Sequence, residues 1–258
     1  MDPGQALIER FARARTDPSL VVLEGLHALK HAMRFGARVE AVCTPDRDAL
    51  IHLANDLAPD LCDRLREIVQ EILPATFGRL VPVPPTTGAL AIAVRPEIDA
   101  AAFLGGSSQA PVVLLENPSH LGNLGAAVRV AAAAGAGGIL VTGTRDPWHP
   151  AALRGSAGLH FALPVARLDR LPDTDRPILA VDPDGERLTP DLLADGAILA
   201  FGSERRGLTQ GMLARAGRRI AIPMRPGVSS LNLACAVAVV LYSWPARQRE
   251  AGSIAAGA

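Results

Sequence analysis

Cysteine and long apolar runs are scarce in this 258-residue chain, and each shortage excludes a class of protein. Cys43, Cys62 and Cys235 are far apart and odd in number, which argues against a disulfide framework and a thiol-rich zinc site. No stretch approaches the roughly 18 consecutive apolar residues of a membrane-spanning helix. The first 15 residues lack the basic and continuously apolar regions of a secretory signal. We therefore expect a cytoplasmic protein with no membrane partner and no metal.

Lysine is almost absent, because every basic residue except Lys30 is arginine. The planar guanidinium suits phosphate groups and base edges, although a genomic preference for arginine would give the same composition. The 26 basic residues are balanced by 26 acidic ones, and residues 1–110 carry 11 basic against 14 acidic side chains. Any nucleic acid must therefore be bound by local patches rather than by overall charge.

A composition of 49% hydrophobic and 20% charged residues excludes a mainly disordered chain. Residues 101–110 are small, rich in Gly and Ser and followed by Pro111, which predicts a linker between two domains. Residues 1–100 predict an α/β domain, and residues 247–258 a frayed tail. The strands expected in the first domain cover 20–23, 39–43 and 80–83, with a helix over 25–35 and two helices between 46 and 73.

Residues 111–246 alternate between strand and helix patterns more sharply. The expected strands cover 112–115, 138–142, 178–181, 197–201 and 219–222, and the expected helices 123–134 and 231–244. Continuous apolar runs are typical of strands buried on both faces, so we expect a parallel sheet with helical crossovers. Ligands of such sheets bind beyond the carboxyl ends of the strands.

The first segment with candidate functional residues is 116–129, where a strand ends in a turn that contains glycine. Asn123 has the short side chain of a helix cap, and we expect the helix to begin near it. The glycine spacing is not G-x-G-x-x-G, which disfavours a dinucleotide site. Arg129 is one charge in a helix of Ala and Val, so it either reaches solvent or faces a site.

The second segment is 200–208, in which an apolar strand runs into Gly202-Ser203-Glu204, two arginines and Gly207. Taken alone, it is better explained by a loop between a strand and a helix whose charged residues face solvent. Its glycines would allow a ligand to approach the backbone closely.

The third segment is 220–233, in which a strand stops at Pro223 and a Pro/Gly loop leads to the last helix. We expect Ser229 or Ser230 to cap that helix. Asn232 is a polar side chain in apolar company, and capping by the serines leaves it unexplained.

Together the three segments resemble the motifs of the SpoU (TrmH-type) RNA ribose methyltransferases of the SPOUT superfamily. Those motifs are an Asn-plus-Arg strand-turn-helix, a G-S-E loop, and an I-P-M…S-L-N helix start, and all occur here in order. Residues 153–158 also resemble the family's R-x-S-x-G stretch. Residues 24–29 and 85–91 resemble the RNA substrate-binding domain that precedes the catalytic domain in many members.

The resemblance implies an α/β fold in which residues 111–246 form a parallel-sheet domain with a trefoil knot, after a smaller α/β substrate-binding domain. It implies an enzyme, a homodimer that uses S-adenosylmethionine to methylate a ribose 2′-hydroxyl of structured rRNA or tRNA. The alternatives are a non-catalytic RNA-binding factor of the same fold, and a methyltransferase of that fold acting on a base or a protein.

The resemblance also assigns roles to residues. Arg129 would contact the ribose and its phosphate, Asn123 would orient Arg129 or the nucleotide, and Glu204 would pair with an arginine or hold its loop. Substrate binding or support of Arg129 would fall to Ser230 and Asn232. The cofactor pocket would be built from Thr142, Gly143, Gly202, Ile222, Met224 and Leu231.

A few other residues have competing interpretations. His27 and His31 have helical spacing, but the glutamate of H-E-x-x-H is missing, which disfavours zinc. Trp148 is expected to pack in the core or at a dimer contact, with base stacking as the alternative. The candidate RNA contacts in the first domain are Arg34, Arg38 and Arg95.

Overall fold

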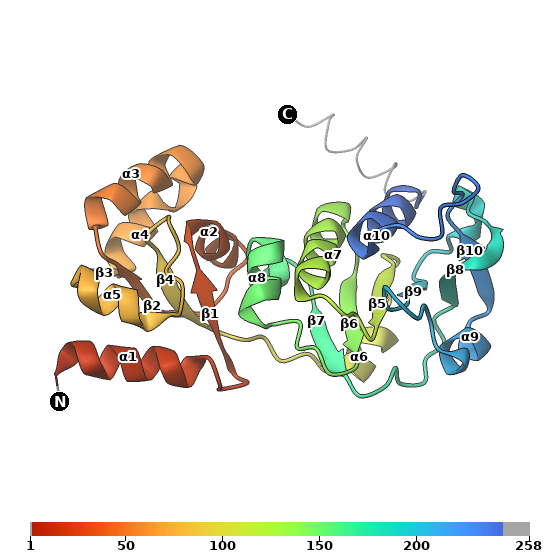
Figure 1. The fold of residues 1–258 in the computed structure, drawn as a ribbon, viewed down its shortest axis with the longest axis horizontal. Helices are drawn as coiled ribbons and strands as arrows, with labels where there is room; N and C mark the ends of the chain where they lie inside the picture. Colours follow the sequence, from red (N-terminus) through yellow and green to blue (C-terminus); the bar gives the residue numbers. More distant parts are fainter. Residues whose placement is uncertain (1, 245–258) are drawn as a thin grey trace. The chain divides into compact units, whose positions relative to one another are not determined.

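The structure is a computed structural model that describes residues 2–244 and divides the chain into two compact units (Figure 1). Within the described residues, unit 1 comprises residues 2–97 and 148–162, and unit 2 comprises residues 98–147 and 163–244. The predicted boundaries were 1–100 and 111–246, so the division differs in two places. Residues 98–110 belong to unit 2, and residues 148–162 belong to unit 1. The predicted tail lies outside the described residues.

Unit 1 contains a four-stranded sheet in the order β1-β4-β2-β3. Only the β2–β3 pair is parallel. The strands are β1 (Leu20–Glu24), β2 (Val39–Thr44), β3 (Val69–Glu71) and β4 (Leu90–Val94). The helices are α1 (Pro3–Ala14), α2 (Leu26–Arg34), α3 (Arg47–Leu57), α4 (Cys62–Ile68), α5 (Pro74–Leu80) and α8 (Pro150–Ser156), with short 3₁₀ turns at Pro59–Leu61 and Leu159–Phe161.

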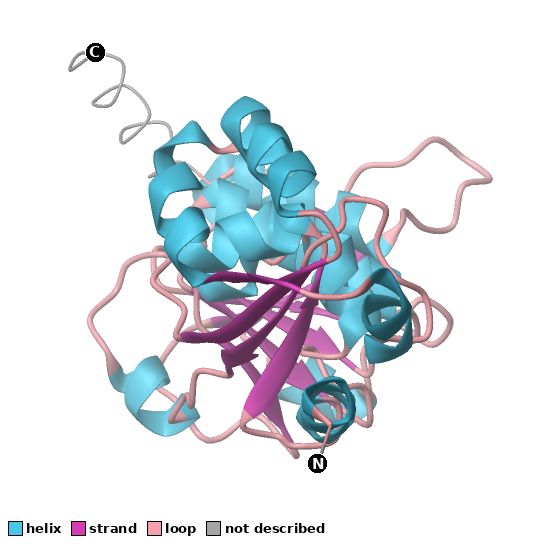
Figure 2. Cartoon of the chain, turned by 90° about the vertical axis from the view of Figure 1, so that its left-hand side faces the viewer, coloured by secondary structure: helices cyan, strands magenta, loops and turns pink. Residues whose placement is uncertain are grey.

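Helices lie on both sides of this sheet (Figure 2). Phe11 of α1 and Phe77 of α5 join Val22, Leu90 and Ile92 in one buried cluster, so these two helices cover one face. The side chains of Asp2 and Asp46 cap α1 and α3 by accepting backbone N–H groups of the first turn. The caps and the apolar stripes together set where these helices begin and which face is buried.

The strand predicted over 80–83 is wrong. Leu80 ends α5, and the fourth strand is β4 further along the chain. Pro82, Pro84 and Pro85 have no backbone N–H, and this segment therefore cannot supply the ladder of a strand inside a sheet.

Residues 148–162 are bound into unit 1 by close backbone packing and buried polar contacts. Gly158 has a φ of +79°, and a Cβ there would lie 2.5 Å from the carbonyl oxygen of Ala28 in α2. The Nδ1 atom of His31 lies 2.7 Å from the carbonyl oxygen of Ala157. Ser156 and His160 are fully buried and contact each other at 2.7 Å.

The Gly158→Ala variant should be strongly destabilised. The left-handed backbone costs an alanine about 1–2 kcal/mol, and overpacking against α2 adds about 1–3 kcal/mol. Urea unfolding followed by circular dichroism measures the loss. Gly36→Ala is the matched control, because Gly36 has a φ of +75° with no atom within 4 Å of the added Cβ. Equal losses in the two variants would contradict the packing role of Gly158.

The burial of Trp148 favours the predicted packing role over the alternative of base stacking. Trp148 is 4% exposed and packs against His160 and Phe161, while the guanidinium of Arg95 lies 5.5 Å from its ring. It is a packing residue of unit 1.

Unit 2 is built on six parallel strands in the order β10-β8-β9-β5-β6-β7, which confirms the predicted parallel α/β fold. The strands are β5 (Val112–Glu116), β6 (Gly138–Thr142), β7 (Val165–Leu168), β8 (Ile178–Arg187), β9 (Ile198–Phe201) and β10 (Arg218–Ala221). The helices are α6 (Ala100–Gly105), α7 (Leu121–Ala134), α9 (Gln210–Arg215) and α10 (Leu233–Tyr242), with a 3₁₀ turn at Pro190–Leu192. The central strands β5 and β6 are buried along their whole length.

The segment predicted as a linker is ordered on unit 2. Asp99 caps α6, and Leu104 enters the core cluster of unit 2. The guanidinium of Arg176 donates to the carbonyl oxygens of Leu104, Gly106 and Gly196 at 2.8–2.9 Å. Because one guanidinium binds three backbone carbonyls, it holds this segment against the loop that precedes β9.

The described helices include none with both the length and the apolar character needed to cross a bilayer.

Candidate functional site

The three motif segments meet beyond the carboxyl ends of β5, β9 and β10 through a continuous chain of hydrogen bonds. The side-chain amide of Asn123 donates to Glu204 Oε1 at 2.9 Å. The amide of Asn232 donates to Asn123 Oδ1 at 2.9 Å, and Asn232 Oδ1 accepts the N–H of Ala234 at 2.9 Å. Side chains 81 and 109 residues apart in the sequence are thereby joined.

Glu204 is the acceptor at one end of this chain. Besides Asn123, its carboxylate accepts the backbone N–H of Ser119 at 2.8 Å and of His120 at 3.4 Å. Burial raises the pKa of Glu204, but the hydrogen bonds from Asn123 and Ser119 outweigh it and lower the pKa from 4.5 to about 2. Glu204 is therefore ionised at neutral pH, and it fixes two loops rather than pairing with an arginine.

This pKa predicts how stability depends on pH. A carboxyl group whose pKa is depressed by folding contributes stability above its unfolded pKa, and that contribution is lost as the pH falls through the folded value. The difference in unfolding free energy between the unchanged protein and Glu204→Gln should therefore shrink as the pH falls from 4.5 to 2. Urea titrations at several pH values measure this difference. A difference independent of pH would contradict the assignment.

Both helix starts at the site differ from the prediction. The N-cap of α7 is His120, with no side-chain cap, so Asn123 lies inside the first turn and its amide is available for the other loops. The N-cap of α10 is Asn232, not Ser229 or Ser230. Asn232 accepts the N–H of Ala234 with its side-chain oxygen and donates to Asn123 with its nitrogen, so one side chain both caps α10 and joins the hydrogen-bond chain.

A second carboxylate links two segments at the same edge of the sheet, and the sequence analysis did not identify it. Glu116, at the end of β5, is buried and accepts both the N–H and the hydroxyl of Thr209, at 2.7 and 2.8 Å. Thr209 caps α9. The one signal in the sequence was an acidic residue directly after an apolar strand.

Arg129 does not join this hydrogen-bond chain. Its side chain is exposed on α7, and no hydrogen bond or ion pair connects it to another residue in the described part of the chain. Six residues are about one and two-thirds helical turns, so Asn123 and Arg129 project in different directions from α7. The expected contact between the two side chains is therefore absent, and Asn123 bonds to Glu204 and Asn232 instead.

A cavity of about 330 Å³ opens beside Glu204. Four of the six residues predicted to bind the cofactor line it, and so does Ser230, which was predicted to bind the substrate or support Arg129. The lining comprises Val181, Asp182, Pro183, Phe201, Gly202, Ser203, Glu204, Arg205, Gly207, Ile222, Met224, Ser229, Ser230, Leu231, Leu233 and Ala236. Its walls are largely apolar, with Asp182, Glu204 and Arg205 as the charged groups.

The other two predicted cofactor residues, Thr142 and Gly143, do not line this cavity. Thr142 ends β6, and its buried hydroxyl has no hydrogen-bond partner among the described residues. Gly143 has a φ of +92°, and a Cβ there would overlap the side chain of Asn117. The glycine is thus explained by close packing with the loop that follows β5.

Asp182 and its neighbours were missed because they come from an irregular part of β8. The pairing of β10 moves from Ala180 to Glu186 between Arg219 and Ile220, so residues 181–185 are skipped. The first three of these residues form one wall of the cavity. No periodicity in the sequence indicates such a bulge.

The loop of Glu204 is closed on itself. Ser203 and Gly207 exchange two backbone hydrogen bonds of 3.1 and 3.0 Å. A Cβ on Gly202 would overlap the backbone of Gly207 and Leu208. This wall of the cavity is therefore a tight turn, and the residue that precedes the turn, Gly202, must be a glycine.

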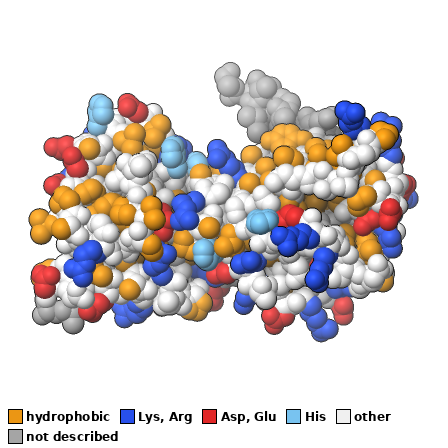
Figure 3. Space-filling view, in the orientation of Figure 1, with side chains coloured by type: hydrophobic (Ala, Val, Ile, Leu, Met, Phe, Trp, Pro, Cys, Tyr) orange, Lys and Arg blue, Asp and Glu red, His pale blue; other side chains and the backbone are white. Residues whose placement is uncertain are grey.

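The surface of unit 2 carries an apolar stripe on α10. Cys235, Val239 and Tyr242 are exposed at helical spacing, Val239 to 40% and Tyr242 to 52%. Apolar side chains gather at the upper edge of unit 2, while basic ones are scattered over both units on the face in view (Figure 3). Among residues 2–244, the structure holds no group of three His, Cys, Asp or Glu side chains arranged for a metal ion.

Known proteins share both the motif-bearing sequence and the fold. The family model described as the SpoU rRNA Methylase family matches residues 110–242. An uncharacterized tRNA/rRNA methyltransferase of Synechocystis sp. is 37% identical over 150 residues, 55% of this chain and 54% of that protein. The 23S rRNA (uridine(2479)-2′-O)-methyltransferase of Streptomyces viridochromogenes is 31% identical over 157 residues, again 55% and 54%. The chain thus spans about half of the length of these curated relatives.

Solved structures resemble the whole chain. The SpoU methyltransferase AviRb from Streptomyces viridochromogenes has a TM-score of 0.74 at 24% identity, covering 95% of this chain and 98% of that one. The AdoMet-bound rRNA methyltransferase from Sinorhizobium meliloti has a TM-score of 0.71 at 21% identity, covering 96% and 95%. At these identities the similarity establishes the two-unit fold.

Proposed function

The chain belongs to the SpoU rRNA methylase family, and on that premise we propose that it transfers a methyl group from S-adenosylmethionine to a ribose 2′-hydroxyl of structured rRNA or tRNA. The observation that carries the proposal is the hydrogen-bond chain Glu204–Asn123–Asn232, which joins the three motif segments beside a cavity that the second and third of them line. The curated relatives are named as methyltransferases of these RNA classes.

The residues present fit the proposed cofactor. The cavity of about 330 Å³ falls at the lower end of the roughly 300–1,000 Å³ range of ligand pockets. Ile222, Met224 and Leu231 supply apolar walls for an adenine ring, and the bare backbone at Gly202 permits close approach. S-adenosylmethionine supplies an electrophilic methyl group on a sulfonium. Thr142 and Gly143 would support the neighbouring loop from outside the cavity.

The chain's own task is to orient a weak nucleophile and help remove its proton. The residues around the cavity would hold S-adenosylmethionine, which would supply the methyl group to the 2′-oxygen and leave as a thioether, while the hydroxyl proton would pass to solvent water. The guanidinium of Arg129 would position the ribose and adjoining phosphate and stabilise developing negative charge on the 2′-oxygen. Glu204, Asn123 and Asn232 would hold the loops, with Ser230 at the substrate side of the cavity.

We propose further that the protein is a homodimer. Arg129 points away from the hydrogen-bond chain of its own subunit, and α10 packs beside α7 with an exposed apolar stripe. Burying that stripe against a second copy would bring Arg129 near the partner's cavity. The proposal has three further parts. Unit 2 would contain the trefoil knot expected of the family, and unit 1 would bind RNA. The protein would act in the cytoplasm, where rRNA and tRNA are found.

The function is tested by incubating the protein with radiolabelled S-adenosylmethionine and unmodified rRNA or tRNA, then digesting the RNA to nucleosides. Label in a 2′-O-methylnucleoside is the expected result, and it also names the RNA. Label in a base would leave the family assignment intact and overturn the ribose assignment. Cofactor binding without transfer to any cellular RNA would support a non-catalytic RNA-binding factor.

A further inference from the structure

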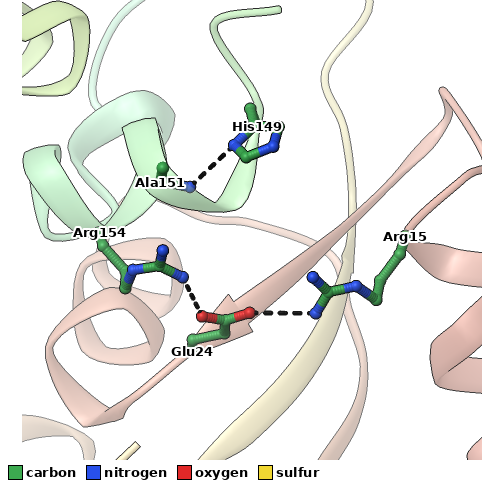
Figure 4. A network of polar contacts seen from close by, with 5 residues as sticks. All are labelled: Arg15, Glu24, His149, Ala151 and Arg154. Atoms are coloured by element: carbon green, nitrogen blue, oxygen red, sulfur yellow. Dashed lines mark hydrogen bonds and ion pairs between the residues drawn. The ribbon is translucent and has the colours of Figure 1, made fainter. Parts of the chain in front are cut away.

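A buried carboxylate in unit 1 holds two arginines that come from distant parts of the chain. Glu24 ends β1, and its side chain is only 7% exposed. Arg15, just after α1, donates to Glu24 Oε1 at 3.2 Å, and Arg154 of α8 donates to Glu24 Oε2. The two guanidinium groups flank the carboxylate from opposite sides (Figure 4).

Both guanidinium groups retain most of their hydrogen-bonding capacity. A guanidinium has five N–H donors, and each of these two spends one on Glu24 in the part of the chain that the structure describes. The side chain of Arg154 is 54% exposed and that of Arg15 is 29% exposed. The carboxylate therefore fixes two cations in place while their remaining donors stay accessible to solvent.

Two of the arginines expected to bind RNA are held differently. Arg34 donates two hydrogen bonds to Asp60, which neutralises it. Arg38 shares Glu40 with Arg10, but the side chain of Glu40 is 27% exposed, against 7% for Glu24, and that of Arg38 is 78% exposed. Arg15 and Arg154 share one carboxylate, so a net positive charge remains. The segment 148–162 brings Arg154 to unit 1 and contains no acidic residue.

We propose that Arg15 and Arg154 bind a backbone phosphate of the substrate RNA. Two fixed guanidinium groups can donate to the two non-bridging oxygens of a backbone phosphodiester, and contacts of this kind set the position of a nucleic acid without reading its sequence. The proposal rests on the proposed function, since it names residues that grip the same RNA. It gives unit 1 a local anion site despite its excess of acidic residues.

The test compares RNA affinity in Arg15→Gln, Arg154→Gln and the double variant of the full chain. Arg64→Gln is the matched control, since Arg64 is exposed on α4 and makes no ion pair with the described residues. The dissociation constant for an unmodified rRNA transcript is measured by filter binding between about 50 and 200 mM salt. Each single variant should bind about tenfold more weakly. The slope of log affinity against log salt should fall by about 0.7–0.9 for each lost phosphate contact.

Three further readouts distinguish phosphate binding from a purely structural role of the two arginines. Affinity for S-adenosylmethionine and kcat at saturating RNA should stay unchanged while KM for RNA rises. Arg154→Lys should bind RNA more tightly than Arg154→Gln, because it keeps a positive charge at this position. If a thermal scan shows that the double variant is unfolded, the RNA affinity of Arg15→Gln alone tests the proposal, because Glu24 still pairs with Arg154 in that variant. Affinity and salt slope equal to those of Arg64→Gln would overturn the proposal and leave the proposed function standing. Failure of the unchanged protein to bind or methylate any RNA would overturn both.

Discussion

Replacing Arg129 with alanine should abolish methyl transfer while leaving S-adenosylmethionine binding unchanged. The side chain lies outside the cavity and bonds to no other described residue, so its removal disturbs neither the pocket nor the hydrogen-bond chain. Loss of one preorganised group that stabilises developing charge lowers kcat by at least about a hundredfold. Single-turnover transfer of labelled methyl and isothermal calorimetry with the cofactor measure the two effects.

Arg170→Ala is the control for this variant, since it removes an exposed arginine that follows β7 on the same unit. It should transfer methyl groups at the rate of the unchanged protein. An Arg129→Ala protein that retains near-normal turnover would remove Arg129 from the proposed mechanism. A loss of turnover matched by a loss of cofactor affinity would reassign it to the pocket.

The second large effect is expected for Gly202→Ala, which should lose cofactor binding. The added methyl overlaps the backbone of Gly207 and Leu208, so the turn held by the Ser203–Gly207 pair must open. Overpacking costs about 1–3 kcal/mol, and about 1.4 kcal/mol corresponds to tenfold in affinity. Calorimetry should therefore show affinity for S-adenosylmethionine reduced about tenfold or more.

Gly211→Ala is the matched control, because Gly211 lies in α9, where the nearest atom to an added Cβ is at an ordinary 3.9 Å. It should bind the cofactor normally. If Gly202→Ala also binds normally, the cavity beside Glu204 is not the cofactor site.

The two inactive variants together test the homodimer. If Arg129 acts on the partner's cavity, a mixed dimer of Arg129→Ala and Gly202→Ala contains one intact cavity served by one intact arginine. Co-expression should then restore part of the activity. No restoration in a mixed dimer that has been isolated would place both residues in the same subunit's site.

Much of unit 2 could be predicted from the sequence because its central strands are buried on both faces. The runs at 112–115 and 139–141 are continuously apolar, and a buried parallel strand explains such short runs between helices. β7 was missed because its four residues include an exposed arginine, Arg167. In unit 1 the apolar residues at 80–83 were misleading, since the intervening proline prevents sheet pairing.

The site was predictable as a set of residue types but not as a set of contacts. An asparagine side chain can donate and accept, so the sequence does not reveal that Asn123 meets Glu204 on one side and Asn232 on the other. The bulge that exposes Asp182 to the cavity, and the pairing of Glu116 with Thr209, depend on contacts between distant segments. Patterns of neighbouring residues in the sequence do not predict such long-range contacts.

The excursion of residues 148–162 limits how the protein can be divided. The chain crosses between the units after residues 97, 147 and 162, so no single cut separates them. A chimaera that exchanges only the first 97 residues for those of a relative would leave Gly158 and His160 facing a foreign surface. The N-terminal unit therefore cannot be exchanged by itself, because part of it lies within the residues that the SpoU rRNA Methylase family model matches.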